Sequence, residues 1–496
     1  MGNSDGVSFI ITIEKSNRNL RAQLESMTAA CRRLGCDYEV LVFLKRKQNE
    51  AERIIEEFQG AYQIEHATIN FFPSALRTGL KRARYEQVLI CCSDDIVTVE
   101  CLKQMLLGLR HYHLICGVRP VLRQGLRISI YRWLWHKLVR FLFNVRFKDI
   151  NCPYKAVIRK KVRQIAYLES GGTLAHTELV ARMKAQKMNI AEFPLQCFHQ
   201  DSDSGESYNI LVLIWTLYRL VKLKVQIFKT QRRLSDESDF HDAWASSTNI
   251  EDLLVTESFE AVTAVENNYA LNEMGDIKGK RILDLGCGLG EASVYFALKG
   301  AVVTAVDISA EMIRVVNQLA EKWNVHVGAR SMIAEDMDID SGEFDLVFGN
   351  GILHHLDRKK AYNEVYRVLK PGGKAVFIEP LCYNPIISFY RLLARTVRTK
   401  NEKPFKFGDF KYLRKLFARV RHREFWLATQ LIFIYFFLIR HTSPAKERYW
   451  KKVIAEADSL EPMYTKLLKA DNWLLKKIPF LKIFCWNTVI VLEKSP

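Results

Sequence analysis

Three glycines at alternate positions follow a short apolar strand pattern in the second half of this 496-residue chain. Residues 282–285 are typical of a strand, Gly286, Gly288 and Gly290 come next, and Glu291 begins a helical pattern. Because glycine has no Cβ, the backbone at these positions can approach a bound molecule closely. The first turn of the helix also leaves N–H groups unpaired. The loop therefore predicts an α/β fold with a pocket for a nucleotide-like cofactor.

Further strand patterns after this loop support a doubly wound sheet. Residues 301–306 are apolar and end on Asp307, whose carboxylate can accept hydrogen bonds from both hydroxyls of a ribose. Residues 344–350 predict a later strand, and residues 367–373 (Arg-Val-Leu-Lys-Pro-Gly-Gly) close a helix before another strand at 374–378. The glycine spacing is G-x-G-x-G, which differs from the G-x-G-x-x-G of dinucleotide folds.

These motifs resemble the class I S-adenosylmethionine-dependent methyltransferases, which have a Rossmann-like fold. The resemblance covers residues 240–380 and rests on five ordered strings, LDLGCGLG, AVDIS, AEDMDI, LHHL and RVLKPGG. The alternative, an ordinary doubly wound domain with a glycine turn, would have to account for all five strings occurring together in this order. The resemblance implies that S-adenosylmethionine is the cofactor and that it is bound by Asp284, Gly286, Gly288, Gly290, Asp307, Asp336 and Asn350.

Within that set, the resemblance implies separate roles. The glycines would approach the methionine and ribose parts, Asp307 would accept from the ribose hydroxyls, and Asp336 would accept from the adenine amino group. Asp284 would fix the loop by accepting backbone or cofactor-ammonium protons. Asn350 would face the methyl-donor pocket, beyond the end of its strand.

Methyl transfer to a hydroxyl needs alignment of the acceptor and removal of its proton. His355 follows the strand that opens onto the pocket and titrates near neutrality, so it is the first candidate for the base. His354 and Asn350 are the other catalytic candidates. A histidine that caps a helix or a strand end is the structural alternative for either histidine.

Residues 231–496 are predicted to form the methyltransferase domain, with a core at 240–380 and a closing antiparallel strand at 485–494. A sixth strand is expected within residues 414–429. The helical insert at about 381–484 is our candidate for a lid or a lipid-acceptor channel. The apolar run at 425–439 is shorter than the ~20 residues of a spanning helix, so it predicts an interfacial or buried helix.

The first 230 residues alternate between strand and helix patterns. Strands are predicted at 8–13, 38–44 and 87–92, and helices at 18–34, 49–58, 74–84 and 99–110. The pattern indicates an α/β domain with a mostly parallel sheet. Five segments resemble family 2 glycosyltransferases of the GT-A fold, especially the polyprenyl-phosphate hexose synthases: residues 19–20, 75–83, 93–95, 149–155 and 191–195.

The resemblance implies that Asp94 and Asp95, at the end of a strand, hold Mg²⁺ or Mn²⁺ on the diphosphate of a sugar nucleotide. A solvated loop with a helix cap is the alternative. The family carries an acidic pair after its second strand, whereas this chain has Lys-Arg-Lys at 45–47. Two interpretations remain open: a bifunctional enzyme with an active glycosyltransferase, and a non-catalytic first domain that serves as a membrane- or acceptor-binding scaffold.

The net charge of +18 is unevenly distributed along the chain. Residues 1–235 carry 37 Lys and Arg against 21 Asp and Glu (+16), residues 236–380 carry 13 against 25 (−12), and residues 381–496 carry 23 against 9 (+14). Basic and bulky apolar residues alternate at helical spacing in 128–143 and 210–222, which favours helices on an anionic membrane surface. Core helices with snorkelling cations are the alternative.

Other classes of function fit the sequence less well. No Asn/Asp-Pro-Pro-aromatic tetrapeptide stands at 350–353, so nucleic acid is not an expected partner. The eleven cysteines form no C-x-x-C pair, which indicates a reduced set without disulfides or zinc. The sequence therefore predicts a cytoplasmic enzyme, peripheral on the membrane face, that O-methylates a membrane-associated glycan, glycolipid or polyprenyl-linked acceptor.

Overall fold

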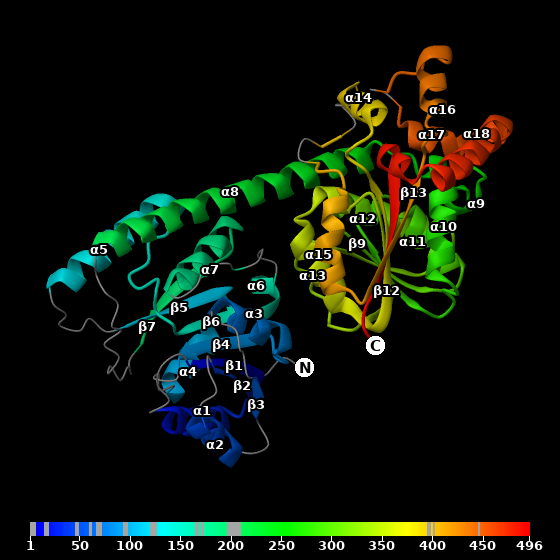
Figure 1. Ribbon diagram of the computed structural model, residues 1–496. Coiled ribbons are helices and arrows are strands. Elements are labelled where there is room, and N and C mark those ends of the chain that lie inside the picture. The colour runs from blue at the N-terminus through cyan, green and yellow to red at the C-terminus, as the bar shows by residue number, and fades with distance from the viewer. Residues whose placement is uncertain are drawn as a thin grey trace. The chain divides into compact units, whose positions relative to one another are not determined.

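The computed structural model divides the chain into two compact units, residues 1–230 and 231–496. The boundary falls inside one long helix, α8 (Ile210–Ser246), so the polar residues 231–239 are helical. Each unit is described by itself (Figure 1). The structure describes residues 6–13, 19–44, 49–58, 62–65, 72–92, 98–119, 126–163, 168, 170, 173–195, 210–393, 398–399, 402–444 and 447–496.

Unit 1 is built on a seven-stranded sheet in the order β3-β2-β1-β4-β6-β5-β7. Strand β6 runs antiparallel to β4 and β5, and the other neighbours pair in parallel. The strands predicted at 8–13, 38–44 and 87–92 are β1, β2 and β4. The strand bounds are β1 Gly6–Ile13, β2 Asp37–Leu44, β3 Tyr62–Glu65, β4 Gln87–Cys92, β5 Leu114–Val118, β6 Lys155–Ile158 and β7 Ile190–Pro194.

Helices cover both faces of this sheet, because side chains along each strand point alternately to opposite sides. Phe9 and Ile11 pack with α1, α2 and α4, whereas Ile10 packs with α3, α5, α7 and α8. The helix bounds are α1 Leu20–Leu34, α2 Asn49–Glu57, α3 Phe72–Arg82, α4 Val99–Gly108, α5 Leu126–Phe143, α6 Arg159–Arg163 and α7 Thr173–Ala185.

The polar residues of the 149–155 segment are held within unit 1. Asp149 is buried and accepts hydrogen bonds from Arg119 Nε and Nη2 at 2.6 and 2.8 Å. Lys155 is fully buried and its Nζ donates to the carbonyl of Ile150 at 3.1 Å. These contacts stabilise the turn before β6. Asp94, Asp95 and residues 45–47 lie outside the described residues.

Unit 2 is a second seven-stranded sheet in the order β10-β9-β8-β11-β12-β14-β13. Strand β14 runs antiparallel to both β12 and β13, and the other pairs are parallel. The closing strand predicted at 485–494 is β14, and β13 lies within 414–429. The bounds are β8 Arg281–Leu285, β9 Val302–Asp307, β10 Val327–Ser331, β11 Phe344–Asn350, β12 Leu369–Pro380, β13 Arg419–Phe425 and β14 Asn487–Glu493.

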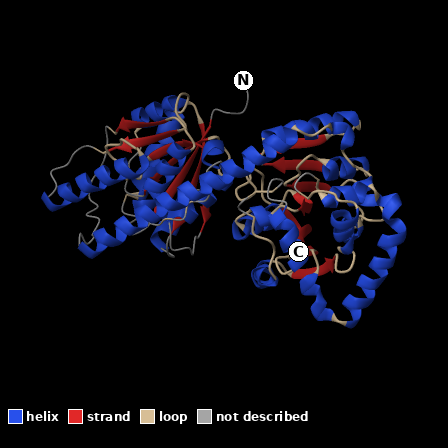
Figure 2. Ribbon diagram, turned by 90° about the horizontal axis from the view of Figure 1, so that it is seen from above, coloured by secondary structure: helices blue, strands red, loops and turns tan. Residues whose placement is uncertain are grey.

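Two cores lie on the two faces of this sheet, and Figure 2 shows helices on both sides of its strands. Along β12, Val376 and Ile378 join the core of α10, α11 and α12, and Ala375 and Phe377 join the core of α13 and α15. The helical bounds are η1 Ile250–Asp252, α9 Glu257–Glu260, α10 Val265–Met274, α11 Glu291–Leu298, α12 Ala310–Lys322, η2 Leu353–His355, α13 Arg358–Val368 and α15 Phe410–Leu416.

The segment at 381–484, predicted as a helical insert, also contains α15 and the sheet strand β13. Its remaining helices gather at one end of unit 2 (Figure 1), where Tyr390 of α14 contacts Phe433 of α16 at 5.7 Å between ring centroids. They are α14 Pro385–Leu393, η4 Phe407–Asp409, α16 Leu431–Ile434, η5 Tyr435–Ile439, α17 Tyr449–Ala455, α18 Ala457–Lys477 and η6 Pro479–Phe484.

The apolar run at 425–439, predicted as an interfacial or buried helix, begins at the last residue of β13, and only residues 431–439 are helical, with one side buried and the other exposed. A left-handed residue, Trp426 (φ +66°), separates this helical part from β13. Phe433 and Phe436 are buried, whereas Ile439 is 67% exposed. Among the described helices, none combines the length and the apolar character that crossing a membrane requires.

Candidate active site

The glycine loop lies between β8 and α11, and its three glycines serve two purposes. All three have positive φ angles, at 70°, 53° and 88° for Gly286, Gly288 and Gly290. A Cβ at Gly288 would meet no atom within 4 Å, whereas a Cβ at Gly290 would lie 2.8 Å from Val316 Cγ2. Gly288 is therefore the position whose open side leaves room for a ligand, and Gly290 permits the close packing of α11 on α12.

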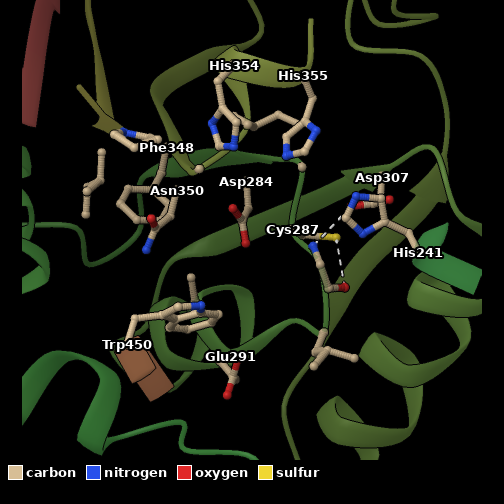
Figure 3. A pocket seen from close by; sticks show the side chains of 18 of the residues that line it. His241, Asp284, Cys287, Glu291, Asp307, Phe348, Asn350, His354, His355 and Trp450 are labelled. Carbon is tan, nitrogen blue, oxygen red and sulfur yellow. Dashed lines mark hydrogen bonds between the residues drawn. The ribbon is translucent and has the colours of Figure 1, made fainter. Parts of the chain in front are cut away.

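A cavity of about 370 Å³ opens at the carboxyl ends of β8, β9 and β11. Figure 3 shows His354 and His355 on one side of it and Trp450 and Glu291 on the other, with Asp284 between them. Most of the sequence-predicted site residues are brought together here: Asp284, Gly286, Gly288, Asp307, Asn350, His354 and His355 all line the cavity. Gly290 and Asp336 are not among the described lining residues.

Asp307 is the last residue of β9 and is 7% exposed. Its Oδ2 accepts a hydrogen bond from Gly288 N at 3.1 Å, and its Oδ1 accepts one from Ser309 N at 3.0 Å. These bonds fix the carboxylate at the strand end and leave further lone pairs for a ligand. The geometry fits the predicted acceptance of ribose hydroxyls.

Asp284 lies behind the loop and is almost fully buried. Ser293 Oγ donates to its Oδ2 at 2.5 Å. Burial raises the pKa of Asp284 to about 7, with the Ser293 bond opposing the shift and the charge of Asp307 adding to it. A cationic ligand group beside this carboxyl would favour its ionised form, because an opposite charge lowers a carboxyl pKa.

Near Asp336, which was predicted to bind the adenine, the preceding residues line the cavity. Residues 332–335 line the cavity, and Asp336 N closes a turn on the carbonyl of Ile333 at 3.2 Å. Glu335 is buried and accepts from Arg233 Nη2 at 2.7 Å and from Asp357 N at 2.9 Å. The turn therefore brings Met332, Ile333 and Ala334 to the cavity, two to four positions before the predicted residue.

His354 is held as part of the protein framework. Its Nδ1 lies 2.9 Å from Glu379 Oε2, and the same carboxylate accepts from Leu353 N at 2.6 Å. Burial lowers the pKa of His354 to about 3 and raises the pKa of Glu379 to about 7. The His354–Glu379 pair binds η2 to the end of β12. This is a structural role, the alternative to catalysis for this histidine.

His355 meets a carboxylate that comes from α8. Its Nδ1 lies 2.9 Å from Glu237 Oε2 and 3.1 Å from Thr399 Oγ1, and its carbonyl accepts from Arg233 Nη1 at 2.8 Å. Burial lowers the pKa of His355, and the charge of His354 adds to the shift while Glu237 opposes it. A neutral imidazole oriented by a carboxylate is suited to accept a proton.

One face of α8 was not recognised from the sequence. Arg233, Glu237, His241 and Trp244 line the cavity, at spacings of four, four and three residues. Such positions share one side of a helix. The spacing of these four residues is the signal that could have identified this face of the helix.

The insert supplies an aromatic part of the cavity wall. Tyr390 of α14 and Trp450 of α17 line it together with Arg448. The Arg448 guanidinium lies 3.6 Å from the ring centroid of Trp244, and burial lowers the pKa of Arg448 to about 10. The insert thus forms part of the site, as a lid or acceptor channel would.

Known proteins resemble the second unit. Residues 283–377 match the model of the Methyltransferase domain family. The Ubiquinone biosynthesis O-methyltransferase of Alkalilimnicola ehrlichii is 35% identical over 112 residues, which are 22% of this chain and 45% of that protein. The protein of that name from Pseudomonas syringae pv. syringae is 35% identical over 117 residues, 23% of this chain and 50% of the relative.

Among solved structures, an S-adenosylmethionine dependent methyltransferase from Mesorhizobium loti is 26% identical, with a TM-score of 0.23 and coverage of 24% of this chain and 55% of that one. The chain spans about half the length of the curated relatives that it matches. The C-terminal region therefore contains a class I S-adenosylmethionine-dependent methyltransferase domain.

Proposed function

We propose that the whole chain is an S-adenosylmethionine-dependent O-methyltransferase. The observation that carries the proposal is one cavity that joins the open Gly288 loop, the Asp307 carboxylate and the His355–Glu237 pair. The matched relatives are named as O-methyltransferases, which favours oxygen as the accepting atom. In this cavity Asp284 would face the cofactor ammonium group, Asp307 the ribose, and residues 332–334 the base.

When bound, S-adenosylmethionine supplies a methyl group on a sulfonium. The acceptor oxygen forms a C–O bond as the S–C bond breaks, which leaves S-adenosylhomocysteine and one proton. Asp307 and the backbone at Gly288 orient the cofactor, and Asn350, whose Nδ2 donates to Asn267 Oδ1 at 3.3 Å, borders the reacting region. His355 accepts the acceptor proton, and Glu237 holds its ring in place.

The acceptor that we propose is a membrane-associated glycan, glycolipid or polyprenyl-linked molecule. Support comes from the insert, where residues that line the cavity stand on the same helices as exposed apolar side chains. On α14, Tyr390 lines the cavity and Phe389 is 57% exposed. Leu438 and Ile439 of η5 are exposed nearby on the packed insert. An apolar rim suits an acceptor that arrives from a lipid surface.

Incubation of the chain with methyl-labelled S-adenosylmethionine and a membrane lipid extract tests this function. Label is expected in lipid that withstands mild alkali, because an ether survives conditions that cleave an ester. Transfer to no component of the extract, while a protein or nucleic acid fraction becomes labelled, would contradict the acceptor class.

Unit 1 carries a surface that we propose as the membrane anchor, formed by the outer faces of α5 and α8. Along α8, the exposed apolar residues of this surface alternate with buried residues such as Leu220 and Leu223, which pack in the core of unit 1. Arg219 lies 4.6 Å from the ring of Trp215, and Lys137 lies 5.6 Å from the ring of Trp133. The exposed members are Trp133, Leu134, Phe141, Ile214, Trp215, Leu217, Tyr218, Val221, Val225 and Phe228.

The chain is expected to sediment with anionic liposomes, and less so as salt rises, because exposed charges are screened within ~10 Å at 0.1 M salt. Replacing both Trp215 and Phe228 with alanine should lower the partition coefficient at least about tenfold, since two apolar rings lose their burial in lipid. Trp473→Ala, at a 60% exposed tryptophan in unit 2, is the matched control. Equal pelleting with neutral and anionic lipid at every salt concentration would contradict this surface.

For unit 1 we propose a GT-A-like glycosyltransferase fold with weak or absent turnover. In support of this, Asp94 and Asp95 stand two and three positions after the end of β4 in the sequence, and β4 pairs in parallel with β1 in a mixed sheet. Ligands of open α/β sheets bind beyond such carboxyl ends. Lys45–Lys47 follow β2, where cations in place of acids remove acceptors for a nucleoside and favour a phosphate group instead. An acceptor-recognition role for unit 1 is the alternative to activity.

UDP- and GDP-sugars offered with Mn²⁺ and polyprenyl phosphate to the full chain should give little or no transfer. Comparison with Asp94→Asn and Asp95→Asn shows whether any transfer depends on the carboxylates. Robust transfer that either substitution abolishes would make the protein a bifunctional enzyme that builds a glycolipid and methylates it.

A further inference from the structure

A buried carboxylate beside the reacting region has no well-aligned hydrogen-bond donor among the described residues. Burial raises the pKa of Glu237, but the nearby His355 and Thr399 side chains outweigh it and keep the pKa below its usual value, so the carboxylate is charged. Glu237 is 4% exposed, and neither Oε1 nor Oε2 accepts a hydrogen bond of normal geometry within the described residues. His355 Nδ1 lies 2.9 Å from Oε2 without the alignment of such a bond. Burying an ionised carboxylate without donors is costly unless a cation compensates it.

A second imidazole, that of His241, joins Glu237 and His355 to give three side chains that could bind a metal ion. His241 stands one helical turn after Glu237 on α8, and its Nε2 lies 3.8 Å from Glu237 Oε2. Its Nδ1 is buried without a hydrogen-bond partner in the part of the chain that is described. Donor atoms of Glu237, His241 and His355 all lie within 4.8 Å of one another.

These distances suit a metal ion. With metal-to-ligand distances of about 2.0–2.2 Å, adjacent ligand atoms stand roughly 3 Å apart in an octahedral site and slightly further apart in a tetrahedral one. The 2.9 Å separation fits directly, and the 3.8 Å separation needs only a small side-chain rotation.

A neighbouring cluster of His354, His355 and Glu402 is also compact and shares His355, but its other two members are already engaged. His354 is bonded to Glu379 at 2.9 Å, and Glu402 pairs with Arg391 at 2.9 Å and with Arg398. The Glu237 cluster is therefore the one with free ligand capacity.

We propose that Glu237, His241 and His355 bind a divalent transition-metal ion such as Zn²⁺, Mn²⁺ or Fe²⁺. Three protein ligands leave coordination positions open, and all three residues line the methyltransferase cavity. The ion would lie between Glu237 Oε2 and His355 Nδ1, which are 2.9 Å apart. The catalytic role of the ion rests on the proposed function. An acceptor hydroxyl bound to the ion would lose its proton to solvent more readily, because the cation lowers the pKa of the hydroxyl. Coordination then replaces direct proton transfer to His355.

Titration of the chelator-treated full chain with Zn²⁺ or Mn²⁺ alone tests the site. Calorimetry is expected to show one site that Glu237→Gln and His241→Gln each weaken at least about tenfold. Glu402→Gln, from the engaged cluster, is the matched control and should bind as the wild type does. Co²⁺ gives a second readout, because its visible spectrum should change in His241→Gln.

The outcomes separate this inference from the proposed function. S-adenosylmethionine binding in each variant reports folding and the cofactor site independently of the metal. If His241→Gln binds the metal as tightly as the wild type, the site is overturned. If methyl transfer persists unchanged after chelation, the catalytic role of the ion is overturned, and the methyltransferase function stands with His355 as the direct proton acceptor.

Discussion

His355→Ala is expected to lower methyl transfer about 10²- to 10⁴-fold while the affinity for S-adenosylmethionine stays nearly unchanged. The side chain lies 2.9 Å from Glu237 and lines the cavity, so its loss removes the group that assists ionisation of the acceptor. Steady-state transfer from labelled cofactor to the lipid extract measures the rate, and calorimetry measures the affinity.

His326→Ala is the matched control, because His326 is exposed and lies outside the cavity in unit 2. Glu237→Gln should also slow transfer, since the amide keeps the shape of the side chain but loses the charge beside the imidazole. Full turnover in His355→Ala would reduce this histidine to a structural residue at the end of β11.

Asp307→Ala is expected to weaken S-adenosylmethionine binding by about 1.5–3 kcal/mol, the scale of lost charge-assisted hydrogen bonds. The carboxylate serves the ligand and also fixes the loop through Gly288 N and Ser309 N. Isothermal calorimetry on the full chain measures the loss, and circular dichroism checks that the fold is retained.

Asp336→Ala provides the comparison, because Asp336 was predicted to bind the adenine but is not among the described residues that line the cavity. A smaller loss of affinity than in Asp307→Ala is expected. If the two variants bind equally weakly, the turn at 332–336 has been assigned to the wrong residues. Undiminished binding in Asp307→Ala would remove the cofactor assignment itself.

Most of the architecture followed from local patterns in the sequence. The apolar runs of β1, β8 and β12 predicted strands, because a strand between two cores has apolar side chains on both faces. The closing strand β14 was expected at 485–494 and pairs antiparallel with β12 over Asn487–Glu493. The insert was harder to predict, because short helices such as α16 contain too few residues for a periodic signal.

The cofactor half of the site was also visible in the sequence. The carboxyl ends of neighbouring parallel strands meet at one sheet edge, so Gly288 and Asp307 were expected to lie together, and Gly288 N does donate to Asp307 at 3.1 Å. Asp336 differs, because it is not among the described residues that line the cavity. A turn of a few residues decides which side chain faces a cavity, and no periodicity marks it.

The sequence by itself determined two kinds of feature. Residue type dictated the backbone conformation of the glycine loop, and polar residues marked the ends of strands at Asp307, at Asn350 and at the His354–His355 pair that follows. Only the tertiary structure decided that Glu237 and His241 stand at His355, more than a hundred residues away along the chain. Local propensities fix strands and turns over a few residues. The approach of α8 to η2 depends on packing between distant segments, which leaves no pattern in either segment alone.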